Sequence, residues 1–117
     1  MTPKDFVSRI QSAVVKQNAA IYKDLFESTQ PEDARDLYWR RALTLHRSLS
    51  EAEQAVLFEI IRQVTVDTVS NLFGVLDGAS VLEGPREDFL LTSQPDDRKL
   101  NGSLQDLFLE AEERDRH

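Results

Sequence analysis

Acidic side chains are concentrated in the last third of the chain, where their charge could organise binding chemistry. Residues 78–117 contain ten acidic residues opposed by five basic ones. The acids are Glu83, Glu87, Asp88, Asp96, Asp97, Asp106, Glu110, Glu112, Glu113 and Asp115. Such a local field steers the approach of a basic protein surface. From this set we predict that Asp96, Asp97, Asp106, Glu110 and Glu113 contact a basic partner. The alternative is that the acids only keep the chain soluble.

An aromatic and basic run occupies residues 38–41. Helical spacing would place Tyr38 and Arg41 on one side, with Trp39 displaced from it. Because aromatic residues and arginine are enriched at protein interfaces, these three residues form a second candidate docking site. The alternative is that Trp39 packs against a neighbouring helix while Arg40 and Arg41 pair with acids of the C-terminal part.

Two carboxylates on one predicted helix could support acid–base chemistry. Glu59 and Asp67 are eight residues apart on the polar side of that helix, with Gln63 between them. If this side is enclosed, their pKa values could be perturbed, whereas if it faces water they only make the helix soluble. Nothing marks a serine as a nucleophile beside His46 or His117, and the chain has no cysteine. We therefore expect a protein that is not an enzyme.

Metal and nucleotide motifs are missing from the sequence. The chain has two histidines and neither the Glu-x-x-His nor the His-Glu-x-x-His spacing of metal sites. Residues 77–88 have the length of a calcium loop, but Leu82 stands where that loop needs glycine and the final glutamate is missing. The four glycines form no phosphate-binding loop. We expect no metal and no cofactor, and we interpret His46 as a packed imidazole or a helix-end cation.

The elements that would position these residues centre on the run from Ser50 to Gly78. Ser50 and Glu53 have the spacing of a capping box, and Gly78 can take the left-handed conformation that ends a helix. Twelve apolar residues between them cover most of the helical circumference, which predicts a helix over about 51–76 surrounded by other elements. Residues 64–69 also alternate like a strand, but the helical pattern continues on both sides. Either the other helices of the chain cover this helix or a second chain contributes, so a homodimer remains an open alternative.

Two helices are predicted before this central one. Residues 2–5 have the character of a helix start, and apolar residues then recur at helical spacing, which predicts a first helix over about 3–26. Pro31 would begin a second helix that ends near residue 47 or 48. Its expected buried side consists of Ala34, Leu37, Tyr38, Leu45 and Leu49. The short connection to the next helix requires a sharp turn or a steep crossing.

Turn signals dominate residues 79–102, which we interpret as an ordered loop that could contain a small hairpin. The side chains expected to hold this loop in place are Val81, Leu82, Phe89, Leu90, Leu91 and Leu100. A last helix is predicted over about 103–113. Its inward residues would be Leu104, Leu107, Phe108 and Ala111, and its outward ones Asp106, Glu110, Glu112 and Glu113. The chain would be one all-α domain over 1–117, a small helical bundle with a three-helix core in 1–78.

The composition narrows the class of protein further. The chain has 117 residues and a net charge of −7. Residues 1–50 hold eight basic and six acidic residues, whereas residues 51–117 hold six and fifteen. This acidic part would repel a phosphate backbone, which argues against binding nucleic acid. Charged residues interrupt the longest apolar run and no signal-peptide pattern is present, so we expect a cytoplasmic protein that does not enter a membrane.

These observations predict a non-enzymatic, acidic protein-binding module. The first hypothesis is an inhibitor of the immunity or antitoxin type that blocks a basic toxin or effector. The second is an adaptor or regulatory subunit that docks through an apolar helix groove with Tyr38, Trp39 and Arg41 at its rim. A small enzyme or ligand-binding bundle that uses Glu59 and Asp67 is the third.

Overall fold

Helices make up most of the molecule, and the computed structural model describes residues 1–94 and 96–116. The elements in chain order are α1 (Pro3–Ile10), the π-helical segment η1 (Gln11–Lys16), α2 (Gln17–Ser28), the 3-10 turn η2 (Pro31–Asp33), α3 (Leu37–Ser48), α4 (Glu51–Leu76), β1 (Thr92–Ser93), β2 (Arg98–Lys99) and α5 (Leu104–Arg116). The all-α prediction is confirmed. Strands β1 and β2, of two residues each, pair antiparallel and form a small hairpin within the loop. Pro95, within the loop expected over 79–102, and His117, one of the two histidines considered above, lie outside the described residues.

The long helix α4 has the predicted bounds because both of its ends have strong local signals. The Ser50 hydroxyl accepts from the Glu53 amide at 3.2 Å, and the Glu53 carboxylate accepts from the Ser50 amide at 2.9 Å. These two bonds complete the predicted capping box. After the helix, Gly78 has a φ of 79°, a conformation that would strain any residue with a side chain. The stretch 64–69, which also alternates like a strand, is helical.

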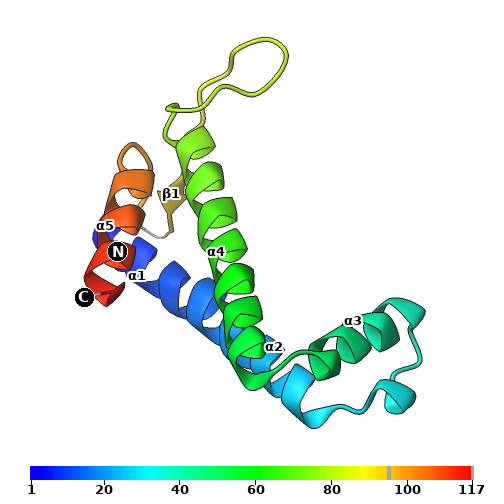
Figure 1. Cartoon of the computed structure of the whole chain (residues 1–117). Coiled ribbons are helices and arrows are strands. Elements are labelled where there is room, and N and C mark those ends of the chain that lie inside the picture. Colours follow the sequence, from blue (N-terminus) through cyan, green and yellow to red (C-terminus); the bar gives the residue numbers. More distant parts are fainter. Residues whose placement is uncertain (95, 117) are drawn as a thin grey trace.

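The first predicted helix is also confirmed, to within two residues at its end. Segments α1, η1 and α2 follow one another without a break and form one rod that crosses α4 (Figure 1). Thr2 and Asp5 form a capping box at the start of this rod.

The second predicted helix begins later than expected. Pro31 starts only the short turn η2, after which Ala34 is extended, with a φ of −82° and a ψ of 128°. Helix α3 begins at Leu37, because the Asp36 carboxylate accepts from the Tyr38 amide at 2.8 Å and caps a new helix there. The proline signal was therefore weaker than the aspartate cap five residues later.

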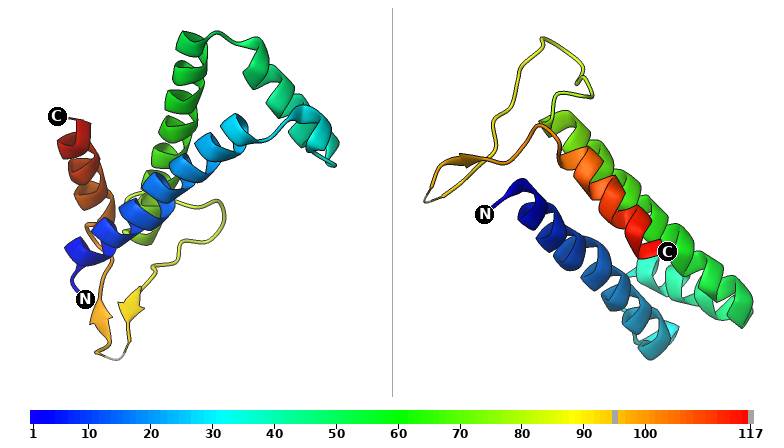
Figure 2. Two further views of the ribbon diagram at one scale, coloured as in Figure 1. Left: turned by 90° about the horizontal axis from the view of Figure 1, so that it is seen from below. Right: turned by 90° about the vertical axis from the view of Figure 1, so that its left-hand side faces the viewer.

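The buried side of α3 also differs from the prediction. Leu37, Tyr38 and Leu45 are exposed, whereas Leu43 and His46 are buried. The reason is that α3 packs with its Leu43 side against the end of α2 and leaves the Leu45 side free. The sharp turn expected between this helix and α4 is confirmed, and α3 points away from the start of α4 so that the two helices form a V (Figure 2).

The hydrophobic core lies where α1, η1, α5 and the second half of α4 meet. Its buried apolar residues are Val7, Val15, Val66, Phe73, Leu104 and Phe108. Phe73 of α4 connects the layers, with its ring centroid 6.1 Å from that of Phe6 and 5.6 Å from that of Phe108. A second, aromatic cluster joins α2, α3 and the first half of α4 and consists of Tyr22, Phe26, Trp39, His46 and Phe58.

The helices of this chain do not surround α4. The α1–α2 rod crosses one side of α4 and α5 lies along another, but a third side has no neighbouring helix among the residues that the structure describes (Figures 1 and 2). Along this side, Val56, Ile60 and Val64 are between 50% and 59% exposed, and Leu72, further along α4 on a different side, is 59% exposed. Complete coverage of α4 within one chain, the first of the two predicted alternatives, is therefore wrong.

Residues in the second half of the loop after α4 hold it against the helices. Leu100 is buried and Leu91 half-buried, as predicted, but Val81, Leu82, Phe89 and Leu90 are exposed and do not hold the loop in place. Polar groups replace them. The buried Asn101 side chain accepts from the Leu91 amide and donates to the Phe89 carbonyl, each at 2.8 Å.

A carboxylate from the end of α4 holds the start of α5. Asp77 accepts from the backbone amides of Gly102 and Gln105, at 2.6 and 2.8 Å. It thereby satisfies amides at the N-terminal end of α5, where a negative charge is favourable. The helix then extends to Arg116, three residues beyond the predicted end.

Candidate protein-binding surfaces

An apolar groove lies in the angle between α3 and α4. It has a volume of about 460 Å³ and is lined by Leu45, Leu49, Ala52, Glu53, Val56, Leu57 and Ile60. We call these seven residues the V surface. Only Leu49 and Ser50 connect the two helices, so the last turn of α3 and the first turns of α4 face the same space. Leu45, Val56 and Ile60 are 54%, 50% and 55% exposed, so large apolar side chains of the groove are open to water.

Apolar side chains continue the V surface in both directions. On α4, Val64 follows Val56 and Ile60 at intervals of four residues and is also exposed. Residues four apart in a helix form a ridge on one side of it. On α3, Tyr38 and Arg41 precede Leu45 by seven and four residues and are both exposed. The V surface is therefore the centre of a longer strip.

The three rim residues predicted from the sequence have different surroundings in the structure, although the rings of Tyr38 and Trp39 pack edge to face with their centroids 5.3 Å apart. Tyr38 is 66% exposed, and Arg41 makes no ion pair within residues 1–94 and 96–116. Trp39 packs against the end of α2, with its ring centroid 6.1 Å from that of Tyr22 and 6.2 Å from that of Phe26. Trp39 thus joins α3 to α2, while Tyr38 and Arg41 remain available beside the V surface.

Three of the five predicted acids lie on one side of α5. Asp106, Glu110 and Glu113 are exposed and follow one another at four and three residues, which is helical spacing. Glu110 lies 3.8 Å from the Arg114 guanidinium, and both side chains are more than half exposed. An exposed pair of this kind contributes little energy, so it does not prevent a partner from contacting Glu110. We call these three residues the acidic face.

The other two acids, Asp96 and Asp97, lie in the turn between β1 and β2. Asp96 accepts from the Ser93 hydroxyl at 2.9 Å and lies 3.7 Å from the amino group of Met1. The hydrogen bond from Ser93, followed by that from the Arg98 amide, lowers the pKa of Asp96 below its ordinary value. Asp97 is exposed with a φ of 51°. Asp96 therefore has a role within the turn, and the hairpin lies beyond the N-terminal end of α5 (Figure 2).

Glu112, which we expected to face outward, is buried. Its Oε2 lies 2.9 Å from Nη2 of Arg62 on α4, and its Oε1 accepts from the Gln11 side chain at 3.0 Å. Gln11 also donates to Asp115, at 3.1 Å. The reason is helical spacing, because Glu112 follows the buried Phe108 by four residues and shares its side of α5. This spacing was visible in the sequence, but the charge of Glu112 suggested an outward position.

The structure does not enclose the carboxylates considered for acid–base chemistry. Glu59 and Asp67 are both exposed on α4, and the Gln63 side chain donates to Asp67 at 2.9 Å. Gln63 in turn accepts from Arg116 at 2.8 Å. Asp67 and Gln63 therefore belong to a hydrogen-bonded polar surface of α4. Neither Glu59 nor Asp67 lines the V-surface groove.

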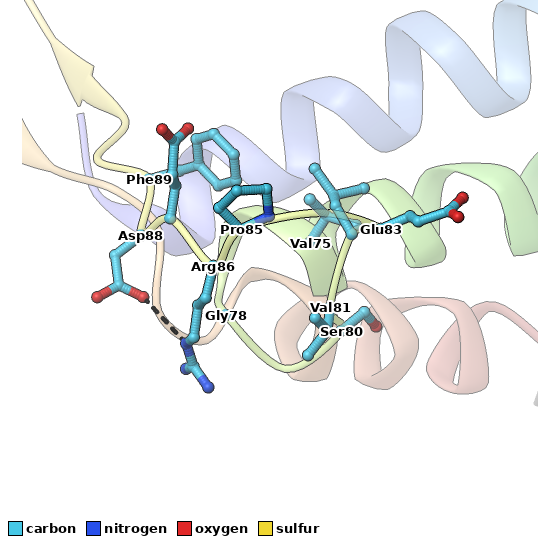
Figure 3. A pocket seen from close by; sticks show the side chains of 11 residues that line it. Val75, Gly78, Ser80, Val81, Glu83, Pro85, Arg86, Asp88 and Phe89 are labelled. Carbon is cyan, nitrogen blue, oxygen red and sulfur yellow. Dashed lines mark ion pairs between the residues drawn. The ribbon is translucent and has the colours of Figure 1, made fainter.

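A cavity of about 280 Å³ lies in the loop after α4 (Figure 3). The loop itself supplies nearly all of its lining, and the lining residues from 80 to 89 are exposed. Arg86 and Asp88, the charged pair at its mouth, are 3.8 Å apart. A cavity formed by one exposed segment has no buried polar group that could orient a ligand.

The remaining chemical candidates give no second site. His46 is buried against Phe26 and Phe58, with ring centroids 5.2 and 5.5 Å away, and so is a packed imidazole. His117 lies outside the described residues. In residues 1–94 and 96–116, no three metal-binding side chains gather at one place. Over the same residues, no helix has both the length and the apolar character needed to span a membrane.

Comparison of the chain with family models, with curated proteins and with solved structures found no match. The argument for function therefore depends on the two surfaces themselves. The V surface was only partly foreseen, since the sequence indicated a docking groove with Tyr38, Trp39 and Arg41 at its rim but not the residues that line it, and Trp39 packs against α2 instead.

Proposed function

We propose that this chain is a non-catalytic protein-binding module, an adaptor or regulatory subunit that docks onto another polypeptide through the V surface. The observation that carries the proposal is the exposure of Leu45, Val56 and Ile60 at 50–55% within one apolar groove. Soluble proteins rarely leave a continuous apolar strip of this kind uncovered unless it binds something.

The surroundings of the groove support a protein as the bound molecule. Aromatic residues and arginine contribute most of the binding energy at protein interfaces, and Tyr38 and Arg41 lie exposed beside the V surface. A groove between two helices also suits an amphipathic helix, which inserts its apolar side chains between them. The cysteine-free composition suits a reducing compartment, and we propose the cytoplasm as the place of action.

The acidic face supports a second candidate function, the inhibition of a basic protein. Asp106, Glu110 and Glu113 project from one side of a helix whose opposite side contains the fully buried Leu104 and Phe108. A carboxylate row on a firmly packed helix needs little ordering when a partner binds. The two candidates use different surfaces and can therefore be tested separately.

Site-specific crosslinking tests the docking function. A photoreactive amino acid at Val56, inside the groove, is expected to form a covalent adduct with a polypeptide in cells that express the chain. The same amino acid at Leu90, which is 69% exposed on the loop, serves as the matched control. Ile60→Glu in the Val56-labelled chain should remove the adduct, because a buried unpaired charge opposes docking.

Adduct formation that is equal at Val56 and Leu90, or that persists with Ile60→Glu, would contradict docking through the V surface. Mass spectrometry of the adduct identifies the bound polypeptide, and that identity separates a foreign partner from a second copy of the chain.

A further inference from the structure

The two helices that form the V carry charges of opposite sign. Helix α3 contains three arginines and no acidic residue, whereas residues 51–61 of α4 contain three glutamates and no basic residue. Arg41 on α3 and Glu59 on α4 are exposed and have no ion-pair partner among residues 1–94 and 96–116. A surface with both signs side by side is complementary to a copy of itself, in which each helix meets the oppositely charged one.

The area exposed by the chain has the size that a stable dimer would bury. The accessible surface is 8361 Å², whereas a compact monomer of 13.4 kDa exposes about 6,500 Å². The excess is about 1,900 Å² per chain and includes the exposed loop over residues 78–90 as well as the V between α3 and α4. Permanent interfaces bury roughly 1,000–2,500 Å² on each partner, so the part of the excess outside the loop can contribute to an interface of this class. The radius of gyration agrees, because it is 17.8 Å against about 13 Å for a compact chain of this length.

We infer that a second copy of this chain covers the V surface in a two-fold dimer, with α3 of each copy in the V of the other. This inference rests on the proposed docking function and names its partner. Val56, Ile60 and Val64 form a ridge of residues four apart, and two such ridges interdigitate when helices cross at about −50°. The apolar ridges then meet near the two-fold axis, and Arg41 of one copy faces the glutamates of the other.

Other occupants fit the charges less well. A foreign helix of one charge sign would pair with only one arm of the V, because a basic helix leaves the arginines of α3 unpaired and an acidic helix leaves the glutamates of α4 unpaired. An anionic lipid surface would be repelled by the glutamates at the start of α4. A second copy provides an acidic segment for the arginines and a basic segment for the glutamates at the same time.

The mass of the purified full-length chain in solution tests this inference. Light scattering behind size-exclusion chromatography should give about twice 13.4 kDa at micromolar concentrations. Ile60→Glu should raise the dimer dissociation constant by at least about 30-fold, the scale of a central interface residue. Val64→Glu provides a second test at an exposed position of the same ridge, and Leu90→Glu is the control that should keep the dimer.

Circular dichroism of each variant shows whether the helices remain, since Ile60 and Val64 are both more than half exposed in the single chain. A folded wild-type chain that stays monomeric at about 100 μM, a concentration at which permanent interfaces are formed, would overturn the inference. So would a dimer that persists in both ridge variants. A monomeric chain that still gives a Val56 adduct with a different polypeptide would overturn the second copy while leaving the docking function intact.

Discussion

A single buried carboxylate joins three helices of the core. Glu112 of α5 contacts Arg62 of α4 and Gln11 of η1, and only 4% of its side chain is exposed. A buried charge without its partner destabilises the fold strongly. The loss of Arg62 would therefore cost more through the unpaired Glu112 carboxylate than through the lost attraction of the pair itself. Arg62 is 31% exposed and can partly rehydrate, which moderates the effect of separating the pair.

Removal of the arginine alone should therefore be more harmful than removal of both charges. We expect Arg62→Met to lower the free energy of unfolding by about 3 kcal/mol, because Glu112 stays buried without a cation. The double variant Arg62→Met/Glu112→Met should lose less than this, because no unpaired charge remains. Urea denaturation followed by circular dichroism measures both. Arg114→Met, which breaks only the exposed pair with Glu110, should cost less than about 0.5 kcal/mol. A double variant less stable than Arg62→Met would contradict this account.

At the scale of the helix, what could be predicted from the sequence depended on how local the signals are. The ends of α4 were predicted correctly because Ser50, Glu53 and Gly78 act within one turn of the helix. The start of α3 was missed because Pro31 and Asp36 compete, and the outcome depends on how the segment packs. The uncovered side of α4 was not predictable, since periodicity reveals which residues are apolar and not which chain covers them.

The capping box of α4 makes a pH-dependent contribution to stability. Hydrogen bonds from the Ser50 amide and then the Ser50 hydroxyl lower the pKa of Glu53 below its ordinary value of 4.5. A carboxylate whose pKa is lower in the folded chain stabilises the fold above the unfolded pKa. This stabilisation is lost as the pH falls from about 5 through the folded pKa.

Glu53→Gln should therefore weaken the dependence of unfolding on pH. The amide oxygen can still accept from Ser50 but does not titrate, so the urea midpoint should fall less between pH 7 and pH 3 than in the wild-type chain. Glu51→Gln removes a charge from the same turn without touching the capping box and should retain the wild-type fall. Equal falls in the wild-type chain and Glu53→Gln would refute the assignment.

At the scale of the whole molecule, the two candidate surfaces lie on separate parts of the fold. Helix α3 extends away from the first half of α4, while α5 lies beside α1 and the second half of α4 (Figure 1). A second copy on the V surface would leave Asp106, Glu110 and Glu113 of both chains accessible. The dimer could then present two acidic faces, and two linked sites bind an oligomeric or repetitive partner far more tightly than one.

The acidic face should attract basic proteins, and the attraction should weaken with salt. It should depend on where the acidic residues lie in the fold as well as on the net charge of the chain. Asp106, Glu110 and Glu113 changed together to lysine should weaken capture of basic proteins on the immobilised chain and flatten its dependence on salt between about 50 and 300 mM, where screening of exposed charges increases. Glu83, Glu87 and Asp88 on the loop, changed together to lysine, alter the net charge by the same amount and are the matched control. If the acidic face binds the partner, the loop variant keeps most of the capture. Equal losses in the two variants would mean that net charge alone attracts basic proteins, and the inhibitor function would then have no defined surface.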